Sequence, residues 1–142
     1  MSDINTLVLN LAVDPLGFAV LHNNTVILCI ITQQQRGSSE WLMTSVTALW
    51  PHLPKIERAV VHLGRGSYTG IRSSLAFARG LSLDGVALYG VSFLDSAANS
   101  RDDPLKFATP ADFFRHLGTH IHAVVDSVNA PLHPLYGTDK YA

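Results

Sequence analysis

The residues best placed to do chemistry form a glycine-rich loop, Gly64-Arg65-Gly66-Ser67-Tyr68-Thr69-Gly70. A short apolar run at 59–63 precedes the loop, and a segment of helix formers and small residues at 71–79 follows it. Free N–H groups at a helix start attract phosphate, so a strand, a glycine loop and a helix in this order indicate an anion cradle. The loop lacks the Gly-Lys-Ser/Thr of a P-loop, and its glycine spacing is one residue too long for the dinucleotide fingerprint.

Two interpretations of this loop stay open. In the first, the loop is a tight turn that packs a helix against a sheet, because glycine lets the backbone approach another group closely. In the second, the loop contacts a nucleotide through Gly64, Gly66, Ser67, Tyr68, Thr69 and Gly70. In both, Thr69 is the expected cap of the helix and Gly80 its expected end.

Other candidate residues carry weaker signals. Asp112, His116 and His120 have i, i+4, i+8 spacing, which can chelate a metal, but a solvated polar face gives the same pattern and we expect no metal site. Ser67 has no base placed near it by the sequence, so it is not expected to be a nucleophile. Cys29, the single cysteine, lies in an apolar run and is expected to be a buried, inert thiol.

The elements that must position these residues alternate in a recognisable way. Strands are predicted at 6–12, 18–21, 25–32, 59–63 and 86–91, with a hairpin turn at 22–24 and 86–91 as the last strand. Helices are predicted at 40–50 (capped by Ser38 or Ser39, ended by Pro51 and Pro54), at 69–79 and at 93–99. A three-strand meander followed by alternating helices and strands predicts an α/β protein with a ribonuclease-H-like mixed sheet (actin/Hsp70 superfamily) of about five strands with flanking helices.

The C-terminal part is predicted to be a helix and a tail. Thr109 and Pro110 form a strong helix start, with Asp112 three residues after the cap. An apolar stripe then runs along the helix: Phe114, Leu117, Ile121, Val124, Val125 and Val128. The polar breaker at 100–104 divides the chain into a domain at 1–100 and a C-terminal helix and tail at 101–142 packed on that domain.

Composition limits the function classes. The chain has 142 residues, of which 47% are hydrophobic and 15% charged, which suits one compact domain with apolar contact surface. A net charge of −1 gives no global basic field to hold nucleic acid, so any RNA contact has to be local or supplied by a partner. A single cysteine fits a reducing compartment. No apolar run approaches the ~18 residues of a membrane span, so we expect a cytoplasmic protein.

The loop and its surroundings resemble the TsaB (YeaZ-like) family, which takes part in making threonylcarbamoyladenosine in tRNA. The stretch 64–72 is similar to that family's Gly-Pro-Gly-Ser-Phe-Thr-Gly-Val/Leu-Arg, with Arg65 in place of the proline. The blocks 78–83 and 88–94 continue the resemblance in register, and the ending 130–136 is similar to the family's closing Pro-Leu-Tyr segment. Typical members continue for about another domain's length, so this chain looks like a member without most of the second lobe.

The resemblance also implies what the first strand does. Relatives that bind Mg-ATP place an aspartate at the end of this strand, and the family often shows Asp-Thr-Ala-Thr there. This chain has Asn10-Leu11-Ala12-Val13. An amide carries no charge and is a poor anchor for Mg²⁺. We therefore expect that the chain binds no cofactor and no metal. We expect it to be a binding subunit rather than an enzyme.

In the family, the two helices on either side of the fourth strand form a contact between subunits. Carried over to this chain, the interface residues are Trp41, Leu42, Ser45, Leu49, Arg72, Leu75, Ala76 and Arg79. The implied partners are a TsaD-type catalytic subunit, a second copy of the chain, and a TsaE-type ATPase, with tRNA reached only indirectly. The alternatives are a degenerate homodimer with a structural or regulatory role, and an ATP-dependent or glycoprotease-like enzyme.

Overall fold

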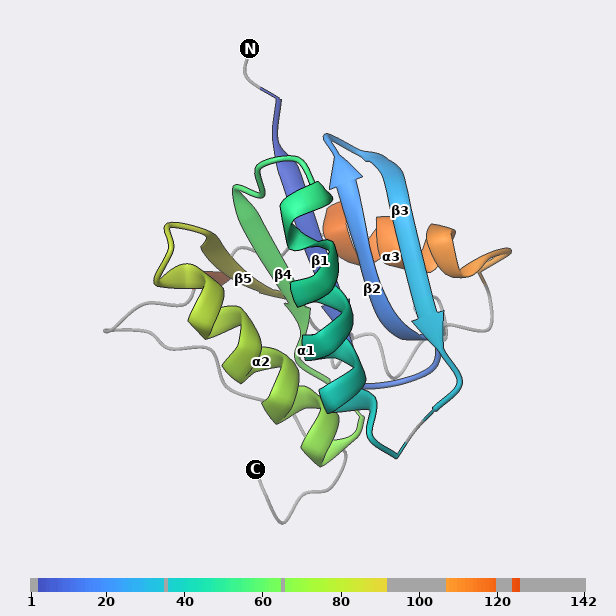
Figure 1. Cartoon of the computed structure of the whole chain (residues 1–142). Coiled ribbons are helices and arrows are strands. Elements are labelled where there is room, and N and C mark those ends of the chain that lie inside the picture. The colour runs from blue at the N-terminus through green and yellow to red at the C-terminus, as the bar shows by residue number, and fades with distance from the viewer. Residues whose placement is uncertain (1–2, 35, 65, 92–106, 120–123, 126–142) are drawn as a thin grey trace.

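A computed structural model of the chain describes residues 3–34, 36–64, 66–91, 107–119 and 124–125. Its centre is one mixed sheet with the strand order β3-β2-β1-β4-β5-β6 (Figure 1). β1, β2 and β3 form an antiparallel meander, and β4 and β5 run parallel to β1. The strands are β1 (Asn5–Asn10), β2 (Leu16–His22), β3 (Thr25–Thr32), β4 (Arg58–His62), β5 (Ala87–Val91) and β6 (Val124–Val125).

The strands follow the predicted ones closely. β1 and β4 lie in the middle of the sheet, and their residues are buried on both faces. A strand that is buried on both faces has a continuous apolar sequence, as these two do. β1 ends at Asn10, two residues before its predicted end. The turn between β2 and β3 is Asn23-Asn24, and Asn23 takes the left-handed φ of 55° that asparagine tolerates. The prediction that 86–91 is the last strand is wrong, since β6 pairs antiparallel with β5.

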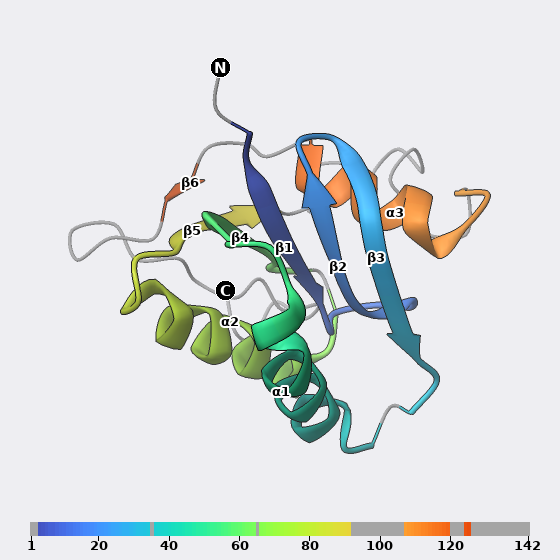
Figure 2. The same ribbon diagram turned by 45° about the horizontal axis from the view of Figure 1, so that its top comes forward.

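Helices cover both faces of the sheet (Figure 2). α1 (Ser38–Leu49), followed by a 3₁₀ turn at Trp50–His52, and α2 (Tyr68–Ser82) lie side by side on one face. Between them and the sheet is a core cluster that includes Leu9, Phe18 and Val61. α3 (Pro110–Thr119) packs on the other face over a second cluster. Burial of each large apolar side chain in these clusters stabilises the fold by about 1.5–3 kcal/mol.

The caps of α1 and α2 differ from the predicted ones. α1 begins at Ser38, directly after Gly37 with φ 79°, and no serine side chain caps it. In α2 the cap is Ser67, not Thr69, because the Ser67 Oγ accepts a hydrogen bond from the Gly70 N–H at 3.1 Å. Gly80 lies inside α2, so the prediction that it ends the helix is wrong.

α3 begins as predicted and ends earlier. The Asp112 N–H donates to the Thr109 Oγ at 3.1 Å, which confirms the predicted cap. The helix stops at Thr119, and Val124–Val125 form β6, so the long apolar stripe to Val128 is wrong as a single helix. Phe113, which sequence reasoning missed, is fully buried against the sheet. The predicted helix at 93–99 and the ending at 130–136 lie outside the described residues, and the division at residue 100 stays a prediction.

Candidate functional site

The carboxyl ends of the parallel strands β1 and β4 bring the chemistry-bearing residues together. Asn10 ends β1, and His62 ends β4 beside it. The Asn10 Oδ1 and His62 Nδ1 atoms are 3.0 Å apart, and both side chains are buried. The glycine loop leaves β4 at the same edge and leads into α2. Ligands of open α/β sheets bind at this edge, which makes it the first place to look for a site.

Asn10 uses its whole hydrogen-bonding capacity on the protein. Its Nδ2 donates to the carbonyl oxygens of Val13 at 2.8 Å and Pro15 at 2.7 Å. Its Oδ1 accepts from the Ala12 N–H at 3.1 Å and from His62. Two carbonyls require donors and one N–H requires an acceptor, so these contacts fix which amide atom is oxygen. The side chain therefore holds the β1–β2 turn in place at the end of β1.

His62 is a neutral imidazole in this setting. An amide oxygen only accepts hydrogen bonds, so the Nδ1 of His62 carries the proton that it shares with Asn10. Burial lowers the pKa of His62 from 6.5 to about 4, and a hydrogen bond with the Gly64 backbone opposes this shift. The Phe113 ring lies nearly perpendicular to the imidazole, with the ring centroids 6.3 Å apart. The Asn10–His62 pair is thus an uncharged, buried contact between the two central strands.

The glycine loop packs directly on the turn after β1. The Ser67 N–H donates to the Ala12 carbonyl at 2.9 Å. A Cβ on Gly66 would lie 2.2 Å from that same oxygen, and a Cβ on Gly70 would lie 2.0 Å from the Leu11 carbonyl oxygen. No side chain fits at either distance, so two of the three glycines serve the close approach of two backbones. Contact of this loop with a nucleotide stays a prediction.

Three of the remaining loop residues are exposed at the start of α2. Ser67, Tyr68 and Thr69 reach solvent, whereas Gly64 is buried and takes a positive φ of 130°. The Arg72 guanidinium donates to the Tyr68 hydroxyl and lies 5.2 Å from the centre of its ring. Thr69, the predicted cap, lies in the first turn of the helix and has no capping role.

The predicted interface residues fall into three groups by burial. Leu42 and Leu75 are 1% and 2% exposed and belong to the core under α1 and α2, so they support the helices from below and offer no surface to a partner. Trp41 is half-buried and tilts against Phe18, with ring centroids 5.8 Å apart. Arg72 and Ala76 are exposed, and three others are half-buried: Ser45, Leu49 and Arg79. Their role in an interface stays a prediction.

Between α1 and α2 lies an open apolar groove that sequence reasoning only partly found. It has a volume of about 450 Å³, and Met43, half of whose surface is exposed, stands at its edge. Ala76 is the one predicted interface residue in its lining, which consists of Ser39, Met43, Ser73, Ala76, Phe77, Gly80 and Leu81. Phe77 and Leu81 continue into a second hollow beside Trp50 and Asp84. The available signal in the sequence was Met43, an apolar residue within the predicted helix at 40–50 and adjacent to the predicted interface residue Leu42.

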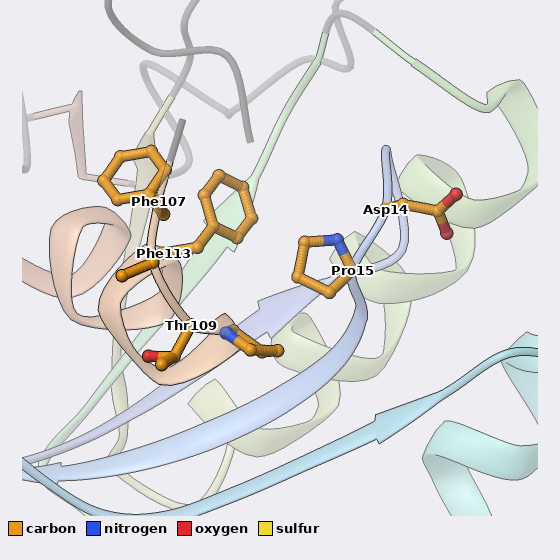
Figure 3. Close-up of a pocket in the computed structure, with 7 residues that line it drawn as sticks. Asp14, Pro15, Phe107, Thr109 and Phe113 are labelled. Carbon is orange, nitrogen blue, oxygen red and sulfur yellow. The ribbon is translucent and has the colours of Figure 1, made fainter. Parts of the chain in front are cut away.

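A pocket on the other face of the sheet lies between the β1–β2 turn and the start of α3 (Figure 3). Its volume is about 280 Å³. Phe107 and Phe113 pack edge to face at one wall, with centroids 5.4 Å apart, and Asp14 and Pro15 form the opposite wall. Among the described residues that line the pocket, Asp14 is the only charged one and it is exposed, so this part of the pocket is mainly an apolar gap between two elements.

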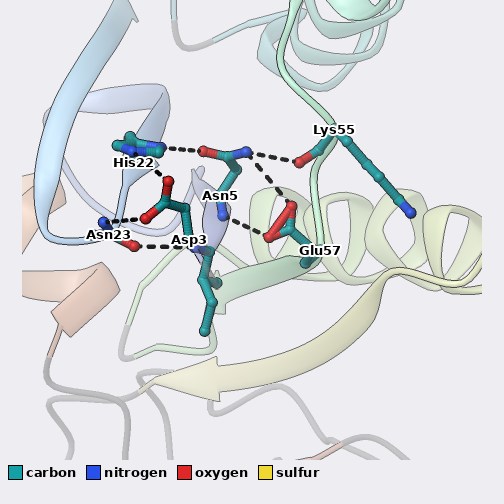
Figure 4. A network of polar contacts seen from close by, with 7 residues as sticks. Asp3, Asn5, His22, Asn23, Lys55 and Glu57 are labelled. Carbon is teal, nitrogen blue, oxygen red and sulfur yellow. Dashed lines mark hydrogen bonds and ion pairs between the residues drawn. The ribbon is translucent and has the colours of Figure 1, made fainter. Parts of the chain in front are cut away.

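A polar network closes the opposite end of the sheet (Figure 4). Asn5 is its centre: its side chain contacts the His22 Nδ1 at 2.9 Å and donates to the Lys55 carbonyl at 3.0 Å. The Asn5 N–H donates to the Glu57 carboxylate at 2.9 Å. The network joins the start of β1 to the segment before β4. These polar residues therefore have a structural role, and they lie at the end of the sheet opposite to Asn10.

Two further findings concern metals and membranes. Across the described residues, no group of three His, Cys, Asp or Glu side chains is arranged to hold a metal ion. The His116 ring packs against Phe107, with centroids 5.2 Å apart, and His120 lies outside the described residues. The helices of the described ranges are all too short or too polar to cross a lipid bilayer.

The strand order and the helices on both faces define the class: the chain has the ribonuclease-H-like α/β fold of the actin/Hsp70 type, as predicted. Among solved structures it is similar to YeaZ from Pseudomonas aeruginosa, with a TM-score of 0.52 and 21% identity over 65% of this chain and 44% of that one. The chain thus spans less than half the length of that protein. No protein-family model matches the sequence, and no curated protein matches it either.

Proposed function

We propose that this chain is a non-catalytic subunit in the formation of threonylcarbamoyladenosine in tRNA, and that it acts by binding a TsaD-type catalytic partner. Its fold is that of YeaZ, and the stretch 64–72 resembles the TsaB signature. The proposed partner site is the groove between α1 and α2. Catalytic chemistry and metal would belong to the partner, with a TsaE-type ATPase as a further component.

The observation that carries this proposal is the exposed apolar lining of the groove. Met43 is 52% exposed at one wall, and Ala76 and Gly80 keep the other wall low. A groove lined by small residues lets another helix approach closely, and Arg72 and Arg79 supply a polar rim along the same helix. A methionine at such an edge adapts to the shape of a partner surface.

The state of Asn10 supports a binding role over catalysis. The amide holds two backbone carbonyls and contacts neutral His62, so the edge that carries the metal in ATP-binding relatives is occupied by internal contacts. An uncharged pair of this kind gives Mg²⁺ no anionic oxygen.

The proposal is tested by co-purifying the full chain with the TsaD-type protein of the same cell. Met43→Lys places a charge in the groove and should weaken binding on the order of tenfold or more. Leu83→Lys is the matched control, because Leu83 is 88% exposed after the end of α2 and does not line the groove. The wild type and the control should retain the partner.

If both Met43→Lys and Leu83→Lys still bind the partner, the interface lies outside the groove. If no complex forms at any salt concentration, the proposal is overturned. The tRNA step is tested in a strain that lacks the full-length family member, by measuring the modified nucleoside after expression of this chain. Binding without restored modification would favour the structural or regulatory alternative. ATP turnover by the pure protein would favour the enzyme alternative.

A further inference from the structure

β3 is an edge strand of unusual composition. It runs over eight residues, Thr25–Thr32, without a charged residue, a glycine or a proline. Within the described part of the chain it pairs with β2 alone. Ile27 and Ile31 are 51% and 43% exposed on it. Edge strands are commonly protected from pairing with another chain by charges, prolines, β-bulges or covering elements. Along β3 there is no charge and no proline, and within the described residues no further strand pairs with its outer edge.

One irregularity divides the strand. Val20 pairs with Leu28 and Leu21 pairs with Val26, so Ile27 is the extra residue of a β-bulge. From Leu28 to Thr32 the pairing with β2 is regular. This five-residue segment is therefore the part of the edge that is flat enough to accept a further strand.

We propose that the edge of β3 binds a second copy of this chain, by antiparallel pairing of Leu28–Thr32 with the same segment of the other copy. The two sheets would then form one continuous sheet around a twofold axis perpendicular to it. Because each copy uses the same edge, the contact closes at two copies and does not extend into a filament. The opposite edge of the sheet, at β6, takes no part.

The register of this pairing follows from which face each side chain occupies. Leu28 and Ile30 pack on the core under α1 and α2, and Cys29 packs on the core under α3. Directly opposed residues of two antiparallel strands point to the same face of the sheet. The twofold axis must therefore pass between a residue and the same residue of the second copy, and not between two residues that are adjacent in the sequence. Centring on the regular segment places the axis at Ile30. Leu28 then opposes Thr32 of the second copy, and Cys29 opposes Ile31.

The chemistry of this register suits a copy of the same strand. Every opposed pair is uncharged, so two identical strands meet without like-charge repulsion. β-branched side chains stand at two of the three positions nearest the axis, and such pairs stabilise sheets. β3 itself offers no charged side chain to a partner of different chemistry, whereas a second copy brings the same uncharged pattern by symmetry.

This contact is separate from the groove proposed above. A twofold axis perpendicular to the sheet keeps the α1–α2 face of both copies on the same side and uncovered. Variants of β3 and variants of the groove can therefore be scored independently, and failure of one proposal does not imply failure of the other.

The register is tested by cross-linking through the native thiol. In Ile31→Cys, the introduced thiol opposes Cys29 of the second copy with about 4.5–5.5 Å between the Cα atoms, inside the range that a disulfide spans. Mild oxidation should then give a covalent dimer in most of the protein. Wild type should not cross-link, because its two Cys29 residues lie two positions apart diagonally, at roughly 8 Å.

Two controls make the result specific. Position 27 is more exposed than position 31 but lies at the bulge, outside the proposed pairing. Random collisions would cross-link Ile27→Cys at least as readily as Ile31→Cys, whereas the proposed register predicts much less cross-linking of Ile27→Cys. The double variant Cys29→Ser/Ile31→Cys lacks the thiol that opposes position 31, so oxidation should no longer give the covalent dimer. Equal cross-linking of Ile27→Cys, or persistence in the double variant, would overturn the proposed register.

Sedimentation of the uncross-linked protein tests the pairing itself. Wild type should have twice the monomer mass, and Ile31→Lys and Ile31→Glu should each weaken the dimer on the order of tenfold or more. A mixture of these two variants should recover the dimer, because opposite charges then face each other diagonally across the axis. A monomeric wild type, a dimer dispersed by Met43→Lys, open-ended aggregation, or no recovery on mixing would each overturn the proposal.

Discussion

Replacing Asn10 with aspartate tests whether the amide is a structural pin or a lost catalytic acid. The change removes both Nδ2 donors, so the carbonyl oxygens of Val13 and Pro15, at 2.8 and 2.7 Å, lose their partner and face another oxygen. A buried acceptor left without a donor costs about 1–3 kcal/mol, and these two part-buried carbonyls lie toward the lower end of that range. Contact of the new carboxylate with the His62 Nδ1–H returns part of this loss. We expect Asn10→Asp to lower the free energy of unfolding by about 2–4 kcal/mol at neutral pH.

The assay is urea and thermal unfolding of the variant and the wild type, with Mg-ATP binding measured on the same samples. For a chain of this length, the expected loss lowers the melting temperature by roughly 10 °C. Asp14→Asn is the control, because it exchanges the same two groups at an exposed site in the same turn and should change stability by less than about 0.5 kcal/mol. An Asn10→Asp protein as stable as wild type that binds Mg-ATP would refute the reasoning.

The remaining predictions concern the glycines and His62. Gly70→Ala should destabilise the fold by at least about 2 kcal/mol, because its Cβ would lie 2.0 Å from the Leu11 carbonyl oxygen, whereas Gly80→Ala, with open space around it inside α2, should stabilise it by about 0.5–1 kcal/mol in the same urea titration. Burial holds the pKa of His62 at about 4, so the unfolded chain binds more protons below pH 6.5, and stability should fall as the pH drops from 6.5 to 4, by about 3 kcal/mol. This part of the pH dependence should be absent from His62→Gln, and an identical pH slope in the two proteins would contradict a neutral, buried His62.

The sheet could be predicted from the sequence because its strands are bounded by local signals. The apolar runs that became β1, β3 and β4 are too short for helices, and Asn23-Asn24 is turn chemistry that acts over two residues. β3 matches its prediction at both ends. Thr109 capped α3 as predicted, since a cap needs only its own first turn. The resemblance in the loop at 64–70 pointed to the same fold.

Helix ends and helix faces were harder to predict. α2 continues past Gly80 as far as Ser82. The unfavourable helix propensity of one glycine costs less free energy than losing the last turn of the helix would. Leu42 and Leu75 have the helical spacing of a contact stripe, but the stripe faces the protein's own core. Val124 extends the same apolar period as Phe114, yet it lies in β6, because pairing with β5 outweighs local periodicity.

The sequence by itself determined the order of strands and helices from β1 to β5, the glycine loop, and the presence of an amide at the end of the first strand. It determined these because hydrophobic period, turn residues and residue type act over a few positions. Only the tertiary structure decided that Asn10 pins a turn, that Gly66 and Gly70 make room for the backbone of Leu11 and Ala12, and that Met43 stands over a groove. These contacts join residues far apart in the chain, so they exist only once the sheet has brought the ends of β1 and β4 together.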